Sequence, residues 1–257
     1  MNKINELFEK KQNNILSLFF TAGYPERDST QQVLEAIQNS DADMVEIGIP
    51  FSDPVADGKV IQDSSAAALK NGMTLDLLLD QLDECREAFT KPALLMGYFN
   101  PVMQYGMERF CERCSRAGIA GLIIPDLPLS EYRKYKEIFR QHGLLFILLV
   151  TPGTTEERLR EIAGEAGGFI YAVSSFSTTG GTGSGSVSKA YIDKVAAICG
   201  LPVLTGFGIH DNKTFRNACE ISSGGIIGSA FIKALSGSTD IKKSVSDFVK
   251  TITGRSI

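Results

Sequence analysis

Residues 44–58 read MVEIGIPFSDPVADG and join a strand-like run to an acidic loop. Within residues 44–49, every second side chain is bulky and apolar, which is the period of a β-strand. Glu46 interrupts this apolar run, and the loop after it carries Asp53 and Asp57 together with two prolines. A carboxyl group inside an apolar strand, followed by a stiffened acidic loop, indicates a functional site at the end of that strand.

Seven more strand-like runs occur along the chain, and amphipathic stretches such as 108–117, 131–141 and 188–198 lie between them. The eight runs are residues 15–21, 44–49, 93–99, 121–125, 144–150, 169–174, 202–207 and 225–228. Nearly continuous apolar strands separated by helices predict a parallel sheet whose two faces are both covered.

Eight such units in 257 residues give about 32 residues per unit, the size of a βα repeat. The repeat favours a (β/α)8 TIM barrel over an open doubly wound sheet, whose G-x-G-x-x-G turn is missing after the first strand. We expect a single domain over 1–257, with an extra N-terminal helix from 2–11 that closes the bottom of the barrel. Residues 63–70 and 74–89 predict two helices in the second unit. The Gly/Ser/Thr-rich stretch 178–188 predicts a mobile active-site loop.

Composition excludes several classes of protein. The formal net charge of −4, without a cluster of basic residues, argues against nucleic-acid binding. The longest strongly apolar run, 144–150, is far shorter than the ~20 residues that span a bilayer. The charged N-terminus has no apolar signal core, and the odd count of five cysteines suggests free thiols. We therefore expect a cytoplasmic protein.

Glu46 is the first candidate for chemistry, because active sites of TIM barrels lie at the carboxyl ends of the strands. The bulky side chains of 44–49 suit the helix side, which turns Glu46 toward the upper interior of the barrel. An apolar environment raises the pKa of a carboxyl group, as a general acid or base near neutral pH requires. The alternative is a structural glutamate paired with a basic residue, but the eight runs contain neither lysine nor arginine.

A second carboxylate follows in the loop, where Asp57 and Asp53 compete for one role. Two carboxyl groups in different environments can divide the work, one transferring protons and the other stabilising positive charge. Spacing alone does not choose between the two aspartates.

Glycine-rich turns after the last strands predict a phosphate site. Residues 206–209 (GFGI) and 228–230 (GSA) stand where this fold often binds phosphate, and 180–181 could close over the same anion. The alternative is that these glycines only form tight turns. His142 and His210 lack neighbours with metal-ligand spacing, so no metal site is predicted. Proton transfer on a phosphorylated small molecule is the chemistry that remains.

These segments resemble the tryptophan synthase alpha chain over essentially the whole length. The most specific stretch is 45–58, and 95–102 (LMGYFNPV), 124–128 (IPDLP), 206–209 and 228–230 agree in order and spacing. The resemblance implies a lyase of tryptophan biosynthesis that cleaves indole-3-glycerol phosphate by a retro-aldol reaction. Its products would be indole and glyceraldehyde 3-phosphate. Glu46 matches the family's proton-transferring glutamate and Asp57 its aspartate facing the indole N–H, which decides against Asp53.

The resemblance also implies the remaining site residues. Substrate-binding positions are Phe19, Met96, Ile123, Tyr171 and Thr179; phosphate-binding positions are Gly180, Gly208, Gly228 and Ser229; beta-chain contacts are Asp53, Pro54, Asn100 and Pro101. No cofactor is expected in this chain, because pyridoxal phosphate belongs to the beta chain of an alpha2-beta2 heterotetramer. Residues 174–180 (SSFSTTG) depart from the family's usual loop, which has an arginine and an earlier glycine.

Three rival functions fit the same fold. One is a stand-alone indole-3-glycerol-phosphate lyase that releases free indole without a partner. Another is a non-catalytic barrel that binds a phosphorylated ligand, which the presence of both Glu46 and Asp57 disfavours. The third is a phosphosugar isomerase, for which the strands supply no base at another position.

Overall fold

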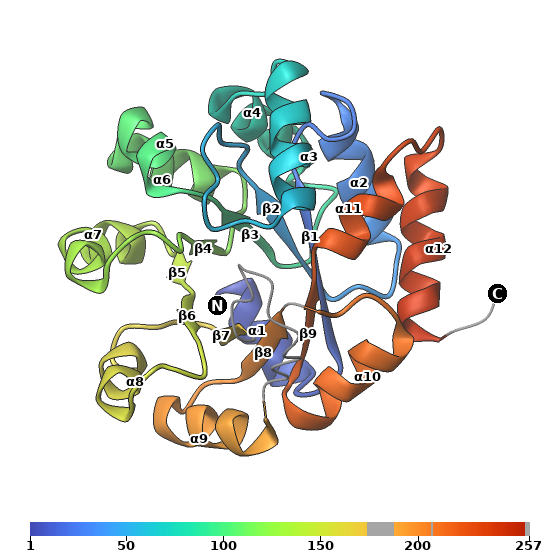
Figure 1. The fold of residues 1–257 in the computed structure, drawn as a ribbon. Helices are drawn as coiled ribbons and strands as arrows, with labels where there is room; N and C mark the ends of the chain where they lie inside the picture. The colour runs from blue at the N-terminus through green and yellow to red at the C-terminus, as the bar shows by residue number, and fades with distance from the viewer. Residues whose placement is uncertain (174–187, 207, 255–257) are drawn as a thin grey trace.

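The computed structural model describes residues 1–173, 188–206 and 208–254. Parallel strands form the centre of the molecule and helices surround them (Figure 1). The strands are β1 (Ile15–Thr21), β2 (Met44–Gly48), β3 (Ala93–Met96), β4 (Gly121–Ile123), β5 (Leu145–Phe146), β6 (Leu148–Val150), β7 (Ile170–Val173), β8 (Val203–Gly206) and β9 (Gly224–Ile227).

The sheet closes at the strand predicted for 144–150. The strand order is β5-β4-β3-β2-β1-β9-β8-β7-β6, and every neighbouring pair is parallel. The two end strands, β5 and β6, are separated in sequence only by Ile147, whose N–H donates to the Leu122 carbonyl at 3.0 Å. The predicted fifth strand therefore pairs with β4 in its first half and with β7 in its second half. This confirms the (β/α)8 barrel and corrects the prediction of one continuous strand.

Helices cover the outside of the strands (Figure 1). They are α1 (Lys3–Lys10), α2 (Ser29–Gln38), α3 (Lys59–Lys70), α4 (Leu75–Cys85), α5 (Phe99–Tyr105), α6 (Met107–Arg116), α7 (Leu129–Gln141), α8 (Glu156–Ala163), α9 (Lys189–Cys199), α10 (Asn212–Ile221), α11 (Ser229–Leu235) and α12 (Ile241–Thr253). Local sequence explains several helix starts, because Thr74, Thr155 and Asp211 each accept a hydrogen bond from a first-turn N–H. Helices α3 and α4 confirm the two helices predicted for the second unit. None of the described helices is long and apolar enough to cross a bilayer.

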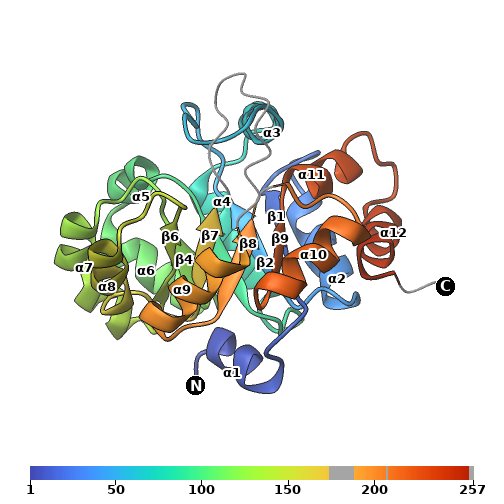
Figure 2. The same ribbon diagram turned by 60° about the horizontal axis from the view of Figure 1, so that its bottom comes forward.

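Helix α1 lies beneath the barrel, as expected for the extra N-terminal helix (Figure 2). Asn2 caps it by accepting from the Ile4 N–H, and its Nδ2 donates to the Ala120 carbonyl at 2.7 Å and the Gly143 carbonyl at 2.9 Å. Ile4 is fully buried in the same apolar cluster as Phe169. The bottom of the barrel is thus sealed, and the opposite end carries the site.

Alternation along each strand sorts the side chains between two apolar clusters. Val45 and Ile47 of β2 belong to the cluster between strands and helices, whereas Met44 and Leu94 belong to the cluster inside the barrel. Glu46 has the same parity as Met44 and therefore projects inward. Its side chain is completely buried.

Candidate functional site

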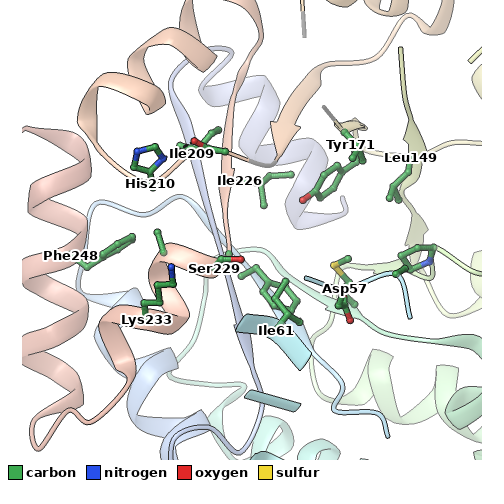
Figure 3. Close-up of a pocket in the computed structure, with 18 residues that line it drawn as sticks. Asp57, Ile61, Leu149, Tyr171, Ile209, His210, Ile226, Ser229, Lys233 and Phe248 are labelled. Carbon is green, nitrogen blue, oxygen red and sulfur yellow. Dashed lines mark hydrogen bonds between the residues drawn. The ribbon is translucent and has the colours of Figure 1, made fainter. Parts of the chain in front are cut away.

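A cavity of about 530 Å³ opens at the carboxyl ends of the strands. Its walls combine strand residues with residues from the loops after β2, β8 and β9 (Figure 3). The lining residues are Phe19, Ala56, Asp57, Ile61, Met96, Pro125, Leu149, Tyr171, Val173, Gly208, Ile209, His210, Ile226, Gly228, Ser229, Ala230, Lys233 and Phe248. A largely apolar wall with a few polar groups is typical of a site for a small organic ligand.

Glu46 has one polar partner. The Ser17 hydroxyl donates to its Oε1 at 2.9 Å, and its Oε2 has no hydrogen-bond partner among the described residues. Burial raises the pKa of Glu46 from 4.5 to about 8, and the hydrogen bond from Ser17 opposes this increase. No ion pair of the described residues includes Glu46, so the alternative of a structural glutamate paired with a basic residue is wrong. At neutral pH its carboxyl group holds a proton.

Glu46 itself does not line the cavity, but its register partner Phe19 does. It pairs in register with Phe19 on one side and Leu94 on the other, and Met96, the next inward residue of β3, lines the cavity. The ring of Phe19 lies over Gly48, since a Cβ at Gly48 would be 2.7 Å from its Cζ. The inward direction of Glu46 agrees with the direction that the sequence predicted.

Asp57 lies in the cavity wall, held by the loop that precedes α3. The Tyr98 hydroxyl donates to its Oδ2 at 3.2 Å and accepts from the Ala56 N–H at 3.0 Å. The Asp57 N–H donates to the Pro54 carbonyl at 3.0 Å, which closes the turn. Burial raises the pKa of Asp57 to about 6, and the hydrogen bond from Tyr98 opposes the increase. Asp53 is exposed and does not line the cavity, so the geometry separates the two aspartates.

Three of the predicted substrate positions, Phe19, Met96 and Tyr171, line the cavity. Ile123 does not; it is fully buried inside the barrel and pairs in register with Met96. Burial, followed by the nearby carboxylates Glu46 and Asp57, raises the pKa of Tyr171, so its hydroxyl stays protonated. The predicted Thr179 and Gly180, and the loop 178–188 up to residue 187, lie outside the described residues.

The three remaining predicted phosphate positions all belong to the cavity wall. Gly208, Gly228 and Ser229 all line the cavity, and α11 begins at Ser229, where first-turn N–H groups have no partner inside the helix. Gly208 has a φ of +77°, a backbone conformation that glycine adopts readily.

Sequence reasoning missed Lys233, which lines the cavity one helical turn after Ser229 on α11. The spacing i, i+4 in 229–233 is the signal that could have found it, because such residues share a helix face. Lys233 and Asp57 lie on opposite sides of the cavity (Figure 3). The cavity therefore has a cationic end beside the glycine turns and an anionic end at Asp57. The described residues contain no group of three or more side chains suited to a metal ion.

Comparisons with known proteins match the chain along nearly all of its length. A family model described as "Tryptophan synthase alpha chain" matches residues 5–255. The tryptophan synthase alpha chain of Christiangramia forsetii is 48% identical over 255 residues, 98% of each chain, and that of Parabacteroides distasonis is 50% identical over 238 residues, 91% of this chain and 93% of the relative. Among solved structures, a tryptophan synthase from Mycobacterium tuberculosis superposes with a TM-score of 0.89 at 27% identity, covering 98% of this chain and 97% of that one. The alpha chain from Legionella pneumophila gives 0.87 at 31% identity, with 99% and 97% covered.

Proposed function

We propose, from the premise that this chain belongs to the tryptophan synthase alpha chain family, that Glu46 and Asp57 carry out its reaction. Members of this family are indole-3-glycerol-phosphate lyases of tryptophan biosynthesis. The observation that supports the assignment is the different environment of the two carboxyl groups. Glu46 is buried and protonated at neutral pH, while Asp57 lines the cavity and ionises at lower pH.

Cleavage requires that indole become a leaving group. Glu46 donates its proton to indole C3, which places positive charge on the ring nitrogen. The bond between C3 and the glycerol carbon then breaks, its electron pair restores the aromatic ring, and the carboxylate of Glu46 takes the proton of the glycerol hydroxyl as the aldehyde forms. The glutamate ends as it began, so one residue serves first as acid and then as base.

Asp57 stabilises the charge that develops during this sequence. Its carboxylate accepts a hydrogen bond from the indole N–H as the ring becomes cationic, and the weakly hydrated cavity strengthens that interaction. The hydroxyl of Tyr98 holds Oδ2, which leaves Oδ1 for the substrate. Phe19, Met96 and Tyr171 supply apolar walls for the indole ring.

The phosphate group of the substrate occupies the opposite end of the cavity. Gly208, Gly228 and Ser229 supply close backbone approach, and Lys233 supplies positive charge. Gly180, Thr179 and Ile123 were also predicted as contacts; Ile123 is fully buried and pairs in register with Met96. The polarity of the cavity orients the substrate with its ring toward Asp57.

The family relationship implies a beta chain as the partner, and pyridoxal phosphate resides in that chain, since alpha chains use no cofactor. The contact surface that we propose comprises Asp53, Pro54, Asn100 and Pro101. Val55 is 85% exposed and Met103 49% exposed, and they adjoin these positions in the loop after β2 and on α5. Large apolar side chains exposed beside polar ones are typical of a protein–protein contact.

Tyr98 connects this surface to the catalytic loop. It precedes α5, and its hydroxyl bonds both the Ala56 N–H and the Asp57 carboxylate. Its ring also lies 5.1 Å from that of Phe51, centroid to centroid. A partner that fixes α5 would therefore also fix the Asp57 loop, and we expect the isolated chain to be a poor catalyst.

Three further assignments complete the proposal. Residues 1–257 form a single domain, because the closed sheet joins β1 near the start of the chain to β9 near its end. Two alpha chains and two beta chains form a heterotetramer. The protein acts in the cytoplasm, as the composition indicated.

The assay is indole release from indole-3-glycerol phosphate by wild type, Glu46→Gln and Asp57→Asn. We expect at least a ~10²-fold loss of kcat for each variant, the effect of losing a proton-transfer or charge-stabilising group. Asp63→Asn, an exposed aspartate of α3, is the matched control. Wild-type turnover in either test variant would refute the assignment.

Addition of purified beta chain tests the partner. We expect turnover to rise, and Asp53→Lys to weaken the effect by reversing a charge at the proposed contact. Full turnover of the isolated chain, with no gain on adding the beta chain, would instead identify a stand-alone lyase.

A further inference from the structure

Among the described residues, Ser17 is the one side chain with a hydrogen bond to Glu46. It lies in β1, is completely buried, and projects into the barrel two residues before Phe19, the register partner of Glu46. Its hydroxyl donates to Oε1 of Glu46 at 2.9 Å. Neither the cavity wall nor the interior apolar cluster includes Ser17.

The hydroxyl of Tyr171 lies near Glu46 without a hydrogen bond to it, and the register neighbours of Glu46 on the adjoining strands are apolar. Leu94 is its register partner on β3, and Met44 is the preceding inward residue of β2. Oε2 is buried and has no hydrogen-bond partner in the described part of the chain. The hydrogen bond from Ser17 to Oε1 is therefore the main factor that distinguishes the two carboxyl oxygens.

That distinction decides where the acid proton resides. A protonated carboxyl group has one carbonyl oxygen, which accepts, and one hydroxyl, which donates. Because Oε1 accepts from Ser17 and the carbonyl oxygen is the stronger acceptor of a protonated carboxyl group, this hydrogen bond favours the proton on Oε2.

We propose that Ser17 is a positioning residue that directs the transferable proton of Glu46 to Oε2. The inference depends on the proposed function of Glu46. During cleavage, Oε2 gives its proton to indole C3 and receives the proton of the glycerol hydroxyl, while Ser17 stays bonded to Oε1 throughout. The hydroxyl also stabilises the carboxylate that exists between the two transfers.

Ser17→Ala removes the hydroxyl and Ser17→Thr keeps it. We expect Ser17→Ala to lower kcat about tenfold, the effect of about one hydrogen bond, with KM nearly unchanged because Ser17 does not touch the substrate. Ser17→Thr should recover most of the loss. Ser29→Ala, which removes another buried serine hydroxyl from the outer layer, is the control.

A measurement on the ligand-free protein distinguishes a role of Ser17 in positioning the proton from a role in packing. The carboxyl of Glu46 is titrated in the ligand-free protein by its infrared carbonyl band, identified by its absence in Glu46→Gln. Loss of the hydroxyl should make Glu46 about a tenfold weaker acid, and Ser29→Ala should leave the titration unchanged. If Ser17→Ala does not fold, Ser17→Cys gives a side chain of similar size with a much weaker donor, and the same shift is expected.

The outcomes distinguish the two proposals. Full activity of Glu46→Gln would refute the function of Glu46 itself. If Glu46→Gln is inactive but Ser17→Ala or Ser17→Cys shows the wild-type titration and kcat, the role of Ser17 is refuted and that of Glu46 stands. A tenfold loss that persists when Ser17→Ala is added to Glu46→Gln would also refute the inference, because Ser17 would then act elsewhere.

Discussion

Replacing Glu46 by glutamine should make the protein more stable at alkaline pH. Burial keeps Glu46 protonated in the folded state until its pKa of about 8, whereas in the unfolded chain it ionises near its ordinary pKa of 4.5. Between these values the folded state binds one proton more than the unfolded state, so stability falls as pH rises. Glutamine does not titrate, so the stability of Glu46→Gln lacks this dependence on pH.

The size of the effect follows from the gap of about 3.5 pH units between 4.5 and about 8. At about 1.4 kcal/mol per unit, the wild type loses at most about 5 kcal/mol across this window. Below pH 4.5 the carboxyl is protonated in both states and the two proteins differ only by the amide substitution. Above pH 8 the carboxyl is ionised in both states, and the difference in stability between the two proteins stays constant.

Urea unfolding of wild type and Glu46→Gln at one-unit steps from pH 4 to pH 9 measures this difference. A pH-independent cost of burying the amide would displace the whole curve without changing its slope. Titration of Asp57 affects both proteins alike, so it cancels in the difference between their unfolding free energies. Glu112→Gln, which changes an exposed carboxyl of α6, is the control and should follow the wild-type curve. A difference between wild type and Glu46→Gln that is flat from pH 5 to pH 8 would refute the buried, protonated state of Glu46.

Three further substitutions test the site. Tyr98→Phe removes a hydrogen bond that lowers the pKa of Asp57, so the acidic limb of the pH–rate profile should move to higher pH; an unmoved limb contradicts this role. Lys233→Met should raise KM for indole-3-glycerol phosphate about tenfold with little change in kcat, as expected for a charged hydrogen-bond partner of the phosphate. Equal KM values would exclude Lys233 from the phosphate end. Gly48→Ala places a Cβ 2.7 Å from the ring of Phe19 and should destabilise the protein by about 1–3 kcal/mol in urea unfolding. Wild-type stability would show that the ring moves freely.

Strand alternation was sufficient to predict the barrel and the inward direction of Glu46. The period of two places every second residue of β2 on one face, and one face of a barrel strand is always interior. Depth along the barrel axis is a different quantity, because it depends on where neighbouring strands end. Ile123, which was predicted as a substrate contact, therefore projects inward without lining the cavity.

Local pattern was also insufficient where pairing changes along a strand. The run 144–150 is uniformly apolar, and its sequence contains no signal for the change of partner at Ile147. In the same way, the sequence alone makes Asp53 and Asp57 equivalent candidates, because it does not give the course of the loop that carries them. The Tyr98 hydroxyl, which fixes Asp57 at the cavity, comes from a different strand and loop. Contacts between distant segments decide both cases.

The two carboxyl groups differ because Glu46 is completely buried and Asp57 lines the cavity. Asp57 on the wall keeps partial contact with water and a hydroxyl donor, so burial raises its pKa only to about 6. Glu46 lies in a layer that water does not reach, and the same cause raises its pKa to about 8. Between these values Asp57 is ionised while Glu46 is protonated, which is the state from which the proposed cleavage begins. The division of labour therefore needs no difference in chemistry between the two side chains, only a difference in burial.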